Sequence, residues 1–429
     1  MPLIMDAKGN KMARLTPYES GAPARPLLSA DLKRKIWHRV TLALLLIVPM
    51  PMASVFSYKE ASDSLQFPED NLFPDVGLEV KPPARTDRAI SYEPPRVRLT
   101  QGHREARIQR SRAALRAEQE LLGYVKSAVS DHIVPSAAVE IYLEQQPAVK
   151  IYQGLDAHRS QPIASLTKSF TAVALMTLVE DGLVDLDAPI SRYGVHVSRS
   201  EFGQITVRDL LLHTSGISYG STLPSYAPGI RHQYSNGNYA HLATIIEHAS
   251  RMSFPEYLEN AIFEPLGMRD SSASEGIKGS SGISSSIHDL GRFGRMLLNG
   301  GSLEGAHILR PESIQEMMQP PAFTPVTDHM QYYAHGFRVE AHHGRVKTFF
   351  HSGLWNGTFS EICVYPEDRS VVIQLANPVS YHSEALGGYR YRVTVLSARY
   401  VDLLARNSLA PTAMQPVTAR FRPAEEARP

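Results

Sequence analysis

The sequence predicts an α+β fold: segments from both ends of the chain form one antiparallel sheet flanked by helices, with a mostly helical insertion between them. Strand-like apolar segments occur within residues 138–152 and again within residues 336–375. Helical patterns lie between them, including an almost wholly apolar run at residues 170–179. Strands at both ends and helices in the middle favour terminal strands that pair in a single sheet.

A helix and a hairpin are expected first. Residues 106–131 have a helical pattern. Ala138–Leu143 and Val149–Tyr152 are then predicted to be paired strands joined by a turn at Gln146–Pro147. The N-terminal contribution to the sheet should therefore be a hairpin.

The middle of the chain is expected to be helical and rich in loops. Phe170–Val179 has no polar face, which predicts a helix buried on all sides. Gly182 is suited to end this helix. Further helices are expected at Val207–Leu212, Tyr239–Ser250, Pro255–Ile262 and Ile287–Leu298.

The chain then returns to strands. They are expected at Gly336–Glu340, Lys347–Phe350, Phe359–Tyr365 and Val371–Leu375. Turn-forming residues at Trp355–Gly357 and Pro366–Asp368 separate the last three. Residues 387–406 should form a closing helix, and the single cysteine, Cys363, should be a buried strand residue.

A basic cluster at residues 33–39 precedes an apolar segment at residues 40–56. This order is typical of an export signal or a membrane anchor. Residues 1–39 are long for the start of a cleaved signal peptide, so we expect an uncleaved single-pass anchor in the inner membrane. A cleaved signal peptide is the alternative, and in both cases the bulk of the chain is exported to the periplasmic side.

Five parts of the chain follow from these features. They are an N-terminal cytoplasmic segment at residues 1–39, the anchor at 40–56, a proline-rich flexible linker at 57–105, one folded domain at 106–406 and a C-terminal tail at 407–429.

Composition excludes several classes of function. A formal net charge of +1 gives no basis for nucleic-acid binding. The 17 histidines show no metal-ligand spacing such as HExxH, and a single cysteine can form neither an intrachain disulfide nor a CxxC site. We therefore expect no metal and no cofactor. Nothing in the sequence indicates an oligomeric state.

Ser165 and Lys168 stand at the start of the predicted buried helix, one turn apart and on one face. A serine hydroxyl becomes a strong nucleophile when a neighbouring base takes its proton. A lysine can be that base when desolvation lowers its pKa, and the apolar run from Phe170 supplies the desolvation. A helix N-terminus also offers N–H groups to a developing oxyanion. The pair is a candidate nucleophile and base, although Ser-x-x-Lys alone also arises by chance.

Two later motifs carry compatible chemistry. Tyr234 could pass a proton to a leaving group, and the amide of Asn236 could hold both a substrate amide and the lysine. His351, Ser352 and Gly353 follow a predicted strand, where a substrate could lie along the strand edge beside a backbone N–H. Taken singly, each motif also reads as an ordinary turn or strand end.

In combination, these motifs resemble those of the penicillin-recognising serine hydrolases, in particular the branch of class C β-lactamases, D-Ala-D-Ala carboxypeptidases and related esterases. The resemblance runs from about residue 118 to residue 405, with the motifs in family order. It implies a β-lactamase/transpeptidase-like fold. Supporting blocks occur at residues 163–172, 180–187, 205–216 and 284–293.

The resemblance also implies roles for the candidate residues. Ser165 would form the acyl-enzyme, with Lys168 and Tyr234 as its general bases and Tyr234 protonating the leaving group. Asn236 would orient the substrate and Lys168. The substrate-binding strand edge would comprise His351, Ser352 and Gly353. The segment His213–Gly216 is taken as structural, because no family role maps onto it.

One departure bears on the substrate. Class C β-lactamases have a lysine where this chain has His351, whereas the carboxypeptidases and some esterases have histidine. We therefore expect a peptidase or esterase acting on a small-molecule or peptide substrate through an acyl-enzyme. The alternatives are a true β-lactamase and a catalytically silent or slowly acylating penicillin-binding sensor or scaffold at the membrane.

Overall fold

The computed structural model describes residues 111–197, 204–274, 279–319, 329–342, 345–355, 357–377 and 384–408. The predicted cytoplasmic segment, anchor and linker lie outside these residues, as does almost all of the predicted tail. No helix in the described ranges is long and apolar enough to cross a membrane.

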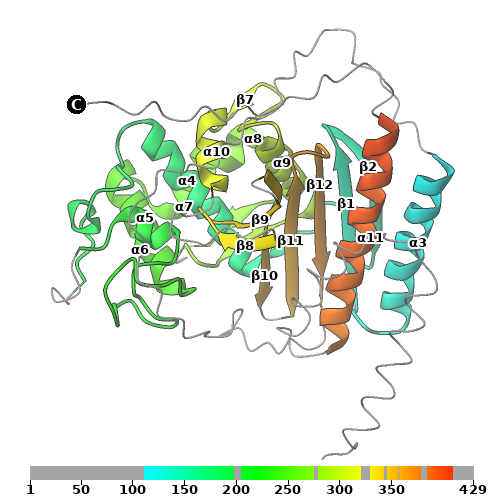
Figure 1. Ribbon diagram of the computed structural model, residues 1–429, viewed down its shortest axis with the longest axis horizontal. Helices are drawn as coiled ribbons and strands as arrows, with labels where there is room; N and C mark the ends of the chain where they lie inside the picture. The colour runs from blue at the N-terminus through cyan, green and yellow to red at the C-terminus, as the bar shows by residue number, and fades with distance from the viewer. Residues whose placement is uncertain are drawn as a thin grey trace, which may run out of the picture. The chain divides into compact units, whose positions relative to one another are not determined.

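One seven-stranded antiparallel sheet forms the centre of the described domain (Figure 1). Its strand order is β2-β1-β12-β11-β10-β9-β8, so the N-terminal hairpin pairs with the last strand of the chain. This arrangement confirms the predicted α+β class and the shared terminal sheet. The strands are β1 (Ala137–Leu143), β2 (Gln146–Gln153), β8 (His329–Tyr333), β9 (Arg338–His342), β10 (Arg345–Trp355), β11 (Thr358–Tyr365) and β12 (Ser370–Ala376).

Two terminal helices cover one face of the sheet. Helix α3 (Arg112–Ser130) and helix α11 (Glu384–Ser408) lie side by side on it. Their apolar residues share a core with one face of strands β1, β2, β11 and β12. Cys363 is buried in this core, as predicted for a strand residue.

The opposite face carries the second and larger core. Helix α9 (Ile287–Leu298) packs on β11 and β12, so both strands are covered on both faces. Strands buried on both faces read as continuous apolar runs, and every residue of β12 is buried. Helix α4 (Thr167–Glu180) runs through this core, with every residue from Thr167 to Met176 buried.

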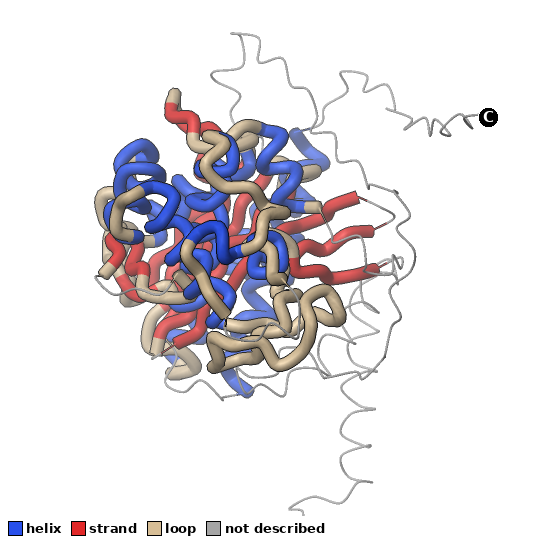
Figure 2. The backbone as a smooth tube through the Cα atoms, turned by 90° about the vertical axis from the view of Figure 1, so that its left-hand side faces the viewer, coloured by secondary structure: helices blue, strands red, loops and turns tan. Residues whose placement is uncertain are grey.

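The helical insertion surrounds α4 on the side of the sheet opposite α3 (Figure 1), and its helices and loops stand in front of the strands in Figure 2. Helix α4 ends where the sequence predicts: Gly182, just past its C-terminus, has the positive φ of 70° that glycine tolerates. The elements here are α5 (Val207–Leu211), α6 (Asn236–Ser250), α7 (Phe254–Leu258), η5 (Glu259–Phe263) and α8 (Glu264–Leu266).

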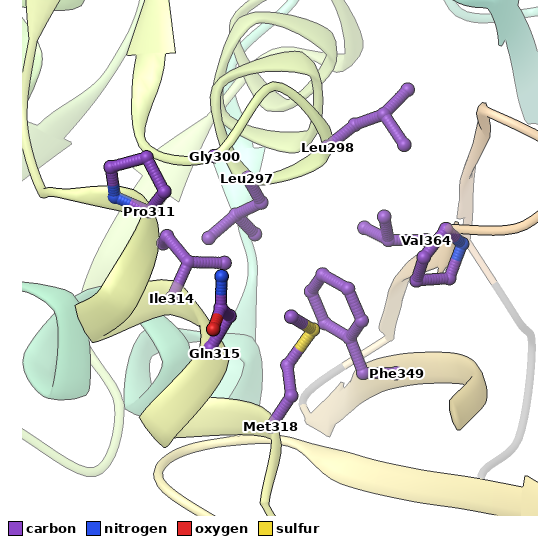
Figure 3. Close-up of a pocket in the computed structure, with 10 residues that line it drawn as sticks. Leu297, Leu298, Gly300, Pro311, Ile314, Gln315, Met318, Phe349 and Val364 are labelled. Carbon is purple, nitrogen blue, oxygen red and sulfur yellow. The ribbon is translucent and has the colours of Figure 1, made fainter. Parts of the chain in front are cut away.

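Helix α10 (Pro311–Met318) packs beside α9 and the sheet. Figure 3 shows a small apolar gap between these elements, lined by residues such as Leu297, Ile314 and Phe349. The gap holds about 40 Å³, far less than the several hundred Å³ of a small-molecule site. The remaining short elements are β3 (Gln161–Pro162), β4 (Ser272–Ala273), β5 (Ile283–Ser285), β6 (Ser302–Leu303), β7 (Ala306–His307), η2 (Ala164–Leu166) and η3 (Ile190–Tyr193).

Three predicted positions need correction. The first hairpin turns at Glu144, where φ is 55°, and Gln146–Pro147 already belong to β2. Ser165 lies in the 3-10 turn η2, immediately before α4 rather than inside it. His351–Gly353 do not follow a strand but lie within β10, because pairing with β11 continues to Trp355.

Candidate active site

The turn η2 places Ser165 immediately before the N-terminus of helix α4. Ser165 is partly exposed, whereas Lys168, one turn later, is fully buried. The Nζ atom of Lys168 lies 3.2 Å from Oγ of Ser165. The apolar run that follows therefore buries the amine and leaves the hydroxyl accessible.

The amine of Lys168 has two further oxygen partners. It donates to Oδ1 of Asn236 at 2.7 Å and to the backbone oxygen of Ser280 at 3.0 Å. A buried amine is costly unless it is hydrogen-bonded, and these two contacts meet that requirement. They also fix the direction in which the amine faces Ser165.

Tyr234 and Asn236 reach the same point from the start of α6. The Lys168 amine lies 4.8 Å from the centroid of the Tyr234 ring. The loop before α6 is held from behind by His213, whose Nδ1 accepts from the backbone N–H of Ser235 at 3.2 Å. Nδ1 of His213 is also 3.0 Å from Nδ2 of Asn238. The segment taken as structural in the sequence thus supports the helix start that carries two candidate residues.

Strand β10 approaches the candidate nucleophile Ser165 closely at Gly353. A Cβ atom on Gly353 would lie 2.0 Å from the backbone oxygen of Ile163 and 2.9 Å from the backbone nitrogen of Ser165. Only glycine therefore fits between the strand and η2. The contact places the β10 backbone beside the backbone nitrogen of Ser165.

His351 is buried in β10 and neutral. Burial, followed by the nearby charges of Lys168 and Arg338, holds the pKa of His351 well below its usual value. Its Nδ1 lies 2.8 Å from the backbone oxygen of Ser352, so Nδ1 carries the proton and donates. Its Nε2 then accepts from the hydroxyl of Tyr333, at 3.1 Å. With both nitrogens engaged, this imidazole shapes the strand and adds no positive charge.

A cleft of about 220 Å³ opens over these groups. Five of the seven residues predicted from the sequence line this cleft. The other two are Lys168, which contacts Ser165 from α4, and Gly353, which lies in β10 next to Ser165. The described lining consists of Ala164, Ser165, Tyr219, Tyr234, Asn236, Ser281, Arg338, His351, Ser352, Leu354, Trp355 and Arg390.

Several lining groups have no signal in the sequence. Arg338 comes from β9 and Arg390 from α11, and the guanidinium of Arg390 lies 3.4 Å from Oγ of Ser352. Arg390 also forms an ion pair with the buried Glu361 at 3.6 Å. Two arginines and no carboxylate line the described part of the cleft, and Glu361 balances the charge of Arg390.

Comparison with known proteins places these features in one family. The family model described as Beta-lactamase matches residues 116–396, well over half of the 429 residues. Among curated proteins, Protein flp of Staphylococcus aureus is 30% identical over 135 residues, 26% of this chain and 27% of that protein. A Beta-lactamase of Yersinia enterocolitica is 22% identical over 158 residues, 31% of this chain and 41% of that protein. The matches thus span less than half of either relative.

Solved structures share the fold across most of the described domain. The D-amino acid amidase of Ochrobactrum anthropi SV3 has a TM-score of 0.55 and 21% identity, covering 68% of this chain and 99% of that one. The octameric penicillin-binding protein homologue of Pyrococcus abyssi has a TM-score of 0.55 and 22% identity, covering 65% and 77%. At these identities the likeness concerns the fold alone.

Proposed function

Because the chain belongs to the beta-lactamase family, we propose that it is a serine hydrolase that cleaves an amide or ester bond through a covalent acyl-enzyme on Ser165. The observation that carries the proposal is the placement of the Lys168 amine. A neutral amine has two N–H groups and one lone pair. Once the charged amine of Lys168 gives up one proton, two N–H groups remain for Asn236 and Ser280, and the lone pair at the position facing Oγ takes the proton of Ser165.

The steps follow from this placement. Oγ of Ser165 attacks the substrate carbonyl while its proton moves to Lys168. The N–H of Ser165 and a backbone N–H of β10 stabilise the tetrahedral oxyanion. The proton then passes to the leaving group through Lys168 or Tyr234, and the acyl-enzyme forms. Water attacks the acyl-enzyme, with the same groups as base, and releases the acid and free Ser165.

We propose that the substrate carries a carboxylate or another anionic group and that the enzyme acts as a peptidase or esterase. Support comes from Arg338 and Arg390 in the cleft lining. A neutral His351 also stands where class C β-lactamases have a lysine, which argues against efficient β-lactam hydrolysis. The D-amino acid amidase with the same fold makes D-amino acid amides a sensible class of test compound.

A substrate panel tests the proposal. The full chain is incubated with p-nitrophenyl esters, D-amino acid amides, peptides ending in D-Ala-D-Ala and a chromogenic cephalosporin. We expect turnover of an ester or amide that Ser165→Ala abolishes, and labelling of Ser165 by a fluorophosphonate. Ser130→Ala, which changes an exposed serine at the end of α3, is the matched control and should retain both.

Two outcomes would contradict the proposal. Turnover that persists in Ser165→Ala would show that another group is the nucleophile. Stable acylation of Ser165 by penicillin without release, together with no turnover of any compound in the panel, would favour a sensor or scaffold instead.

We also propose that the hydrolase works on the periplasmic side of the inner membrane, held there by residues 40–56. The support is the basic cluster at residues 33–39 followed by the apolar segment. Cell fractionation tests this: the full chain should sediment with membranes, and a chain lacking residues 1–56 should not.

A further inference from the structure

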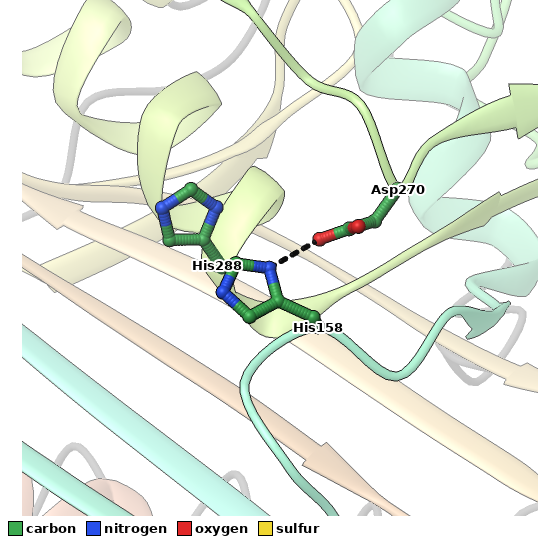
Figure 4. A group of neighbouring side chains, drawn as sticks. All are labelled: His158, Asp270 and His288. Carbon is green, nitrogen blue, oxygen red and sulfur yellow. Dashed lines mark hydrogen bonds and ion pairs between the residues drawn. The ribbon is translucent and has the colours of Figure 1, made fainter.

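Two histidines and an aspartate from three separate segments meet outside the cleft (Figure 4). His158 lies in the loop after β2, Asp270 in the turn between α8 and β4, and His288 in the first turn of α9. Nδ1 of His158 is 2.8 Å from Oδ2 of Asp270. One ligand atom from each of the three residues lies within 4.8 Å of the other two.

The surrounding contacts hold these segments together. The backbone N–H of His288 donates to the backbone oxygen of Ala157 at 3.1 Å, which ties α9 to the His158 loop. Oγ of Ser286 donates to Oδ2 of Asp270 at 2.8 Å. The three side chains therefore converge on one point from a fixed backbone.

The buried carboxylate of Asp289 contacts two of the three residues. Asp289 is 1% exposed, and its Oδ2 accepts from the backbone N–H of Asp270 at 2.7 Å. Its Oδ1 lies 3.3 Å from Nδ1 of His288. A carboxylate on one ring nitrogen is the usual means of orienting an imidazole whose other nitrogen binds a metal.

We propose that His158, Asp270 and His288 bind a divalent metal ion of the zinc class. Two imidazoles and one carboxylate form a ligand set that suits Zn²⁺, Ni²⁺ or Cu²⁺, whereas Mg²⁺ and Ca²⁺ require oxygen ligands. Water would complete a tetrahedral site.

The three ligand atoms are close enough for small side-chain movements to bring them into contact with one ion. Bonds of about 2.0–2.1 Å place tetrahedral ligand atoms roughly 3.4 Å apart. The His158 and His288 side chains are 65% and 32% exposed, so both rings have room to rotate inward. Nδ1 of His158 and Oδ2 of Asp270, now 2.8 Å apart, would move slightly apart to reach the tetrahedral spacing.

The proposed metal is structural. None of the three ligands is among the described residues that line the active-site cleft. The ion would instead join three segments around β5, the strand whose backbone N–H at Ile283 contacts Oγ1 of Thr167 in the catalytic helix. Metal binding should therefore raise thermal stability and leave the chemistry of Ser165 to the residues described above.

Calorimetric titration of the full chain, purified without a polyhistidine tag and stripped with EDTA, tests the proposal. We expect Zn²⁺ to bind and Mg²⁺ not to compete. Each of His158→Ala, Asp270→Asn and His288→Ala should lower the Zn²⁺ affinity at least about tenfold. His307→Ala removes another exposed histidine, on β7, and should leave the affinity unchanged.

Thermal unfolding gives a second readout that does not depend on hydrolase activity. Saturating Zn²⁺ should raise the Tm of the wild type by about 5 °C and that of His158→Ala by much less. Equal Tm values in EDTA would establish that the variant is folded. Zn²⁺ binding that is as tight in the His158→Ala/His288→Ala variant as in the wild type would overturn the proposal, whether or not Ser165 is catalytic.

Discussion

The amine of Lys168 touches three oxygen atoms that belong to three different parts of the chain. The hydroxyl of Ser165 comes from η2, the amide of Asn236 from α6 and the carbonyl of Ser280 from the segment before β5. Two of these oxygens are fixed acceptors, and only the hydroxyl can give up a proton. In the proposed mechanism, Ser165 is therefore the partner that gives its proton to Lys168.

Replacing this amine tests its role at the residue scale. Lys168→Met keeps the length and burial of the side chain but removes the base, so we expect acylation to slow by about 10²–10⁴-fold. The rate of fluorophosphonate labelling of Ser165 measures this. Lys150→Met, at an exposed position of β2, should label at the wild-type rate. Equal rates for both variants would exclude Lys168 as the base.

A second prediction at the residue scale concerns Gly353. Gly353→Ala would push a methyl group into the backbone of Ile163 and Ser165, so we expect lost acylation and a lower free energy of unfolding. Gly388→Ala is the control, because Gly388 lies inside α11 with open space around it. There alanine should stabilise the chain by about 0.5–1 kcal/mol. Normal labelling of Gly353→Ala would refute the close approach.

A sequence can reveal a candidate residue when it belongs to a short motif whose residue types and spacing are unusual. Ser165 and Lys168 are three residues apart at the start of an apolar run, and Gly353 follows His351 and Ser352 after a predicted strand. Arg338 and Arg390 give no such signal, because an arginine on a strand or helix normally faces solvent. These two guanidinium groups line the cleft only because β9 and α11 pack against β10.

At the scale of elements, the start of α6 is the part of the site most dependent on its neighbours. Its preceding loop rests on His213, which has a φ of 58°. Burial holds the pKa of His213 well below its usual value, so the ring is neutral and its Nδ1 is free to accept the Ser235 N–H. His213 therefore holds the backbone between Tyr234 and Asn236, and we expect the segment His213–Gly216 to act on catalysis through these two residues.

Removing this support should slow the enzyme without touching the reacting groups. We expect His213→Ala to lower the rate of Ser165 labelling about 10–100-fold, since small displacements of catalytic groups have effects of that size. His241→Ala, whose ring contacts the backbone oxygen of Thr222 from the same helix, should label normally. Labelling of His213→Ala at the wild-type rate would limit His213 to a role in stability.

Element length decided which parts of the fold could be predicted. Helix α9 occupies Ile287–Leu298 as expected, because its apolar residues repeat at helical spacing over three turns. Strands β3 to β7 have two or three residues each, too few for any periodic signal. The cluster of His158, Asp270 and His288 was missed for a related reason: its members are far apart in sequence and meet only through the pairing of β3, β4 and β5.

At the scale of the whole molecule, buried neutral histidines should make stability depend on acidity. Burial lowers the pKa of His335 to about 3 and that of His232 to about 4, and those of His213 and His351 also fall. Below the unfolded pKa the unfolded chain binds more protons than the folded one. The stabilisation is therefore full above about pH 6.5 and is lost as the pH falls toward the folded values.

Urea unfolding between about pH 5 and pH 7 measures this dependence. Each such histidine should contribute a slope of up to about 1.4 kcal/mol per pH unit. His335→Gln should reduce the slope by that amount, and His307→Gln, at an exposed position, should leave it unchanged. A slope that is the same in wild type and His335→Gln would contradict the buried neutral state of His335.

The pairing of β1 with β12 has a consequence for the order in which the protein becomes active. When synthesis has just passed Lys168, the proposed nucleophile Ser165 and its proposed base have both been made. Ser360, whose hydroxyl donates to the backbone oxygen of Ile163, lies 197 positions after Ile163. Ala376, which pairs with Ala137 between β12 and β1, is made later still. A chain that ends before β10 therefore contains Ser165 and Lys168 but not the strand that lies beside Ser165. We expect hydrolysis to begin only when synthesis of β12 is finished.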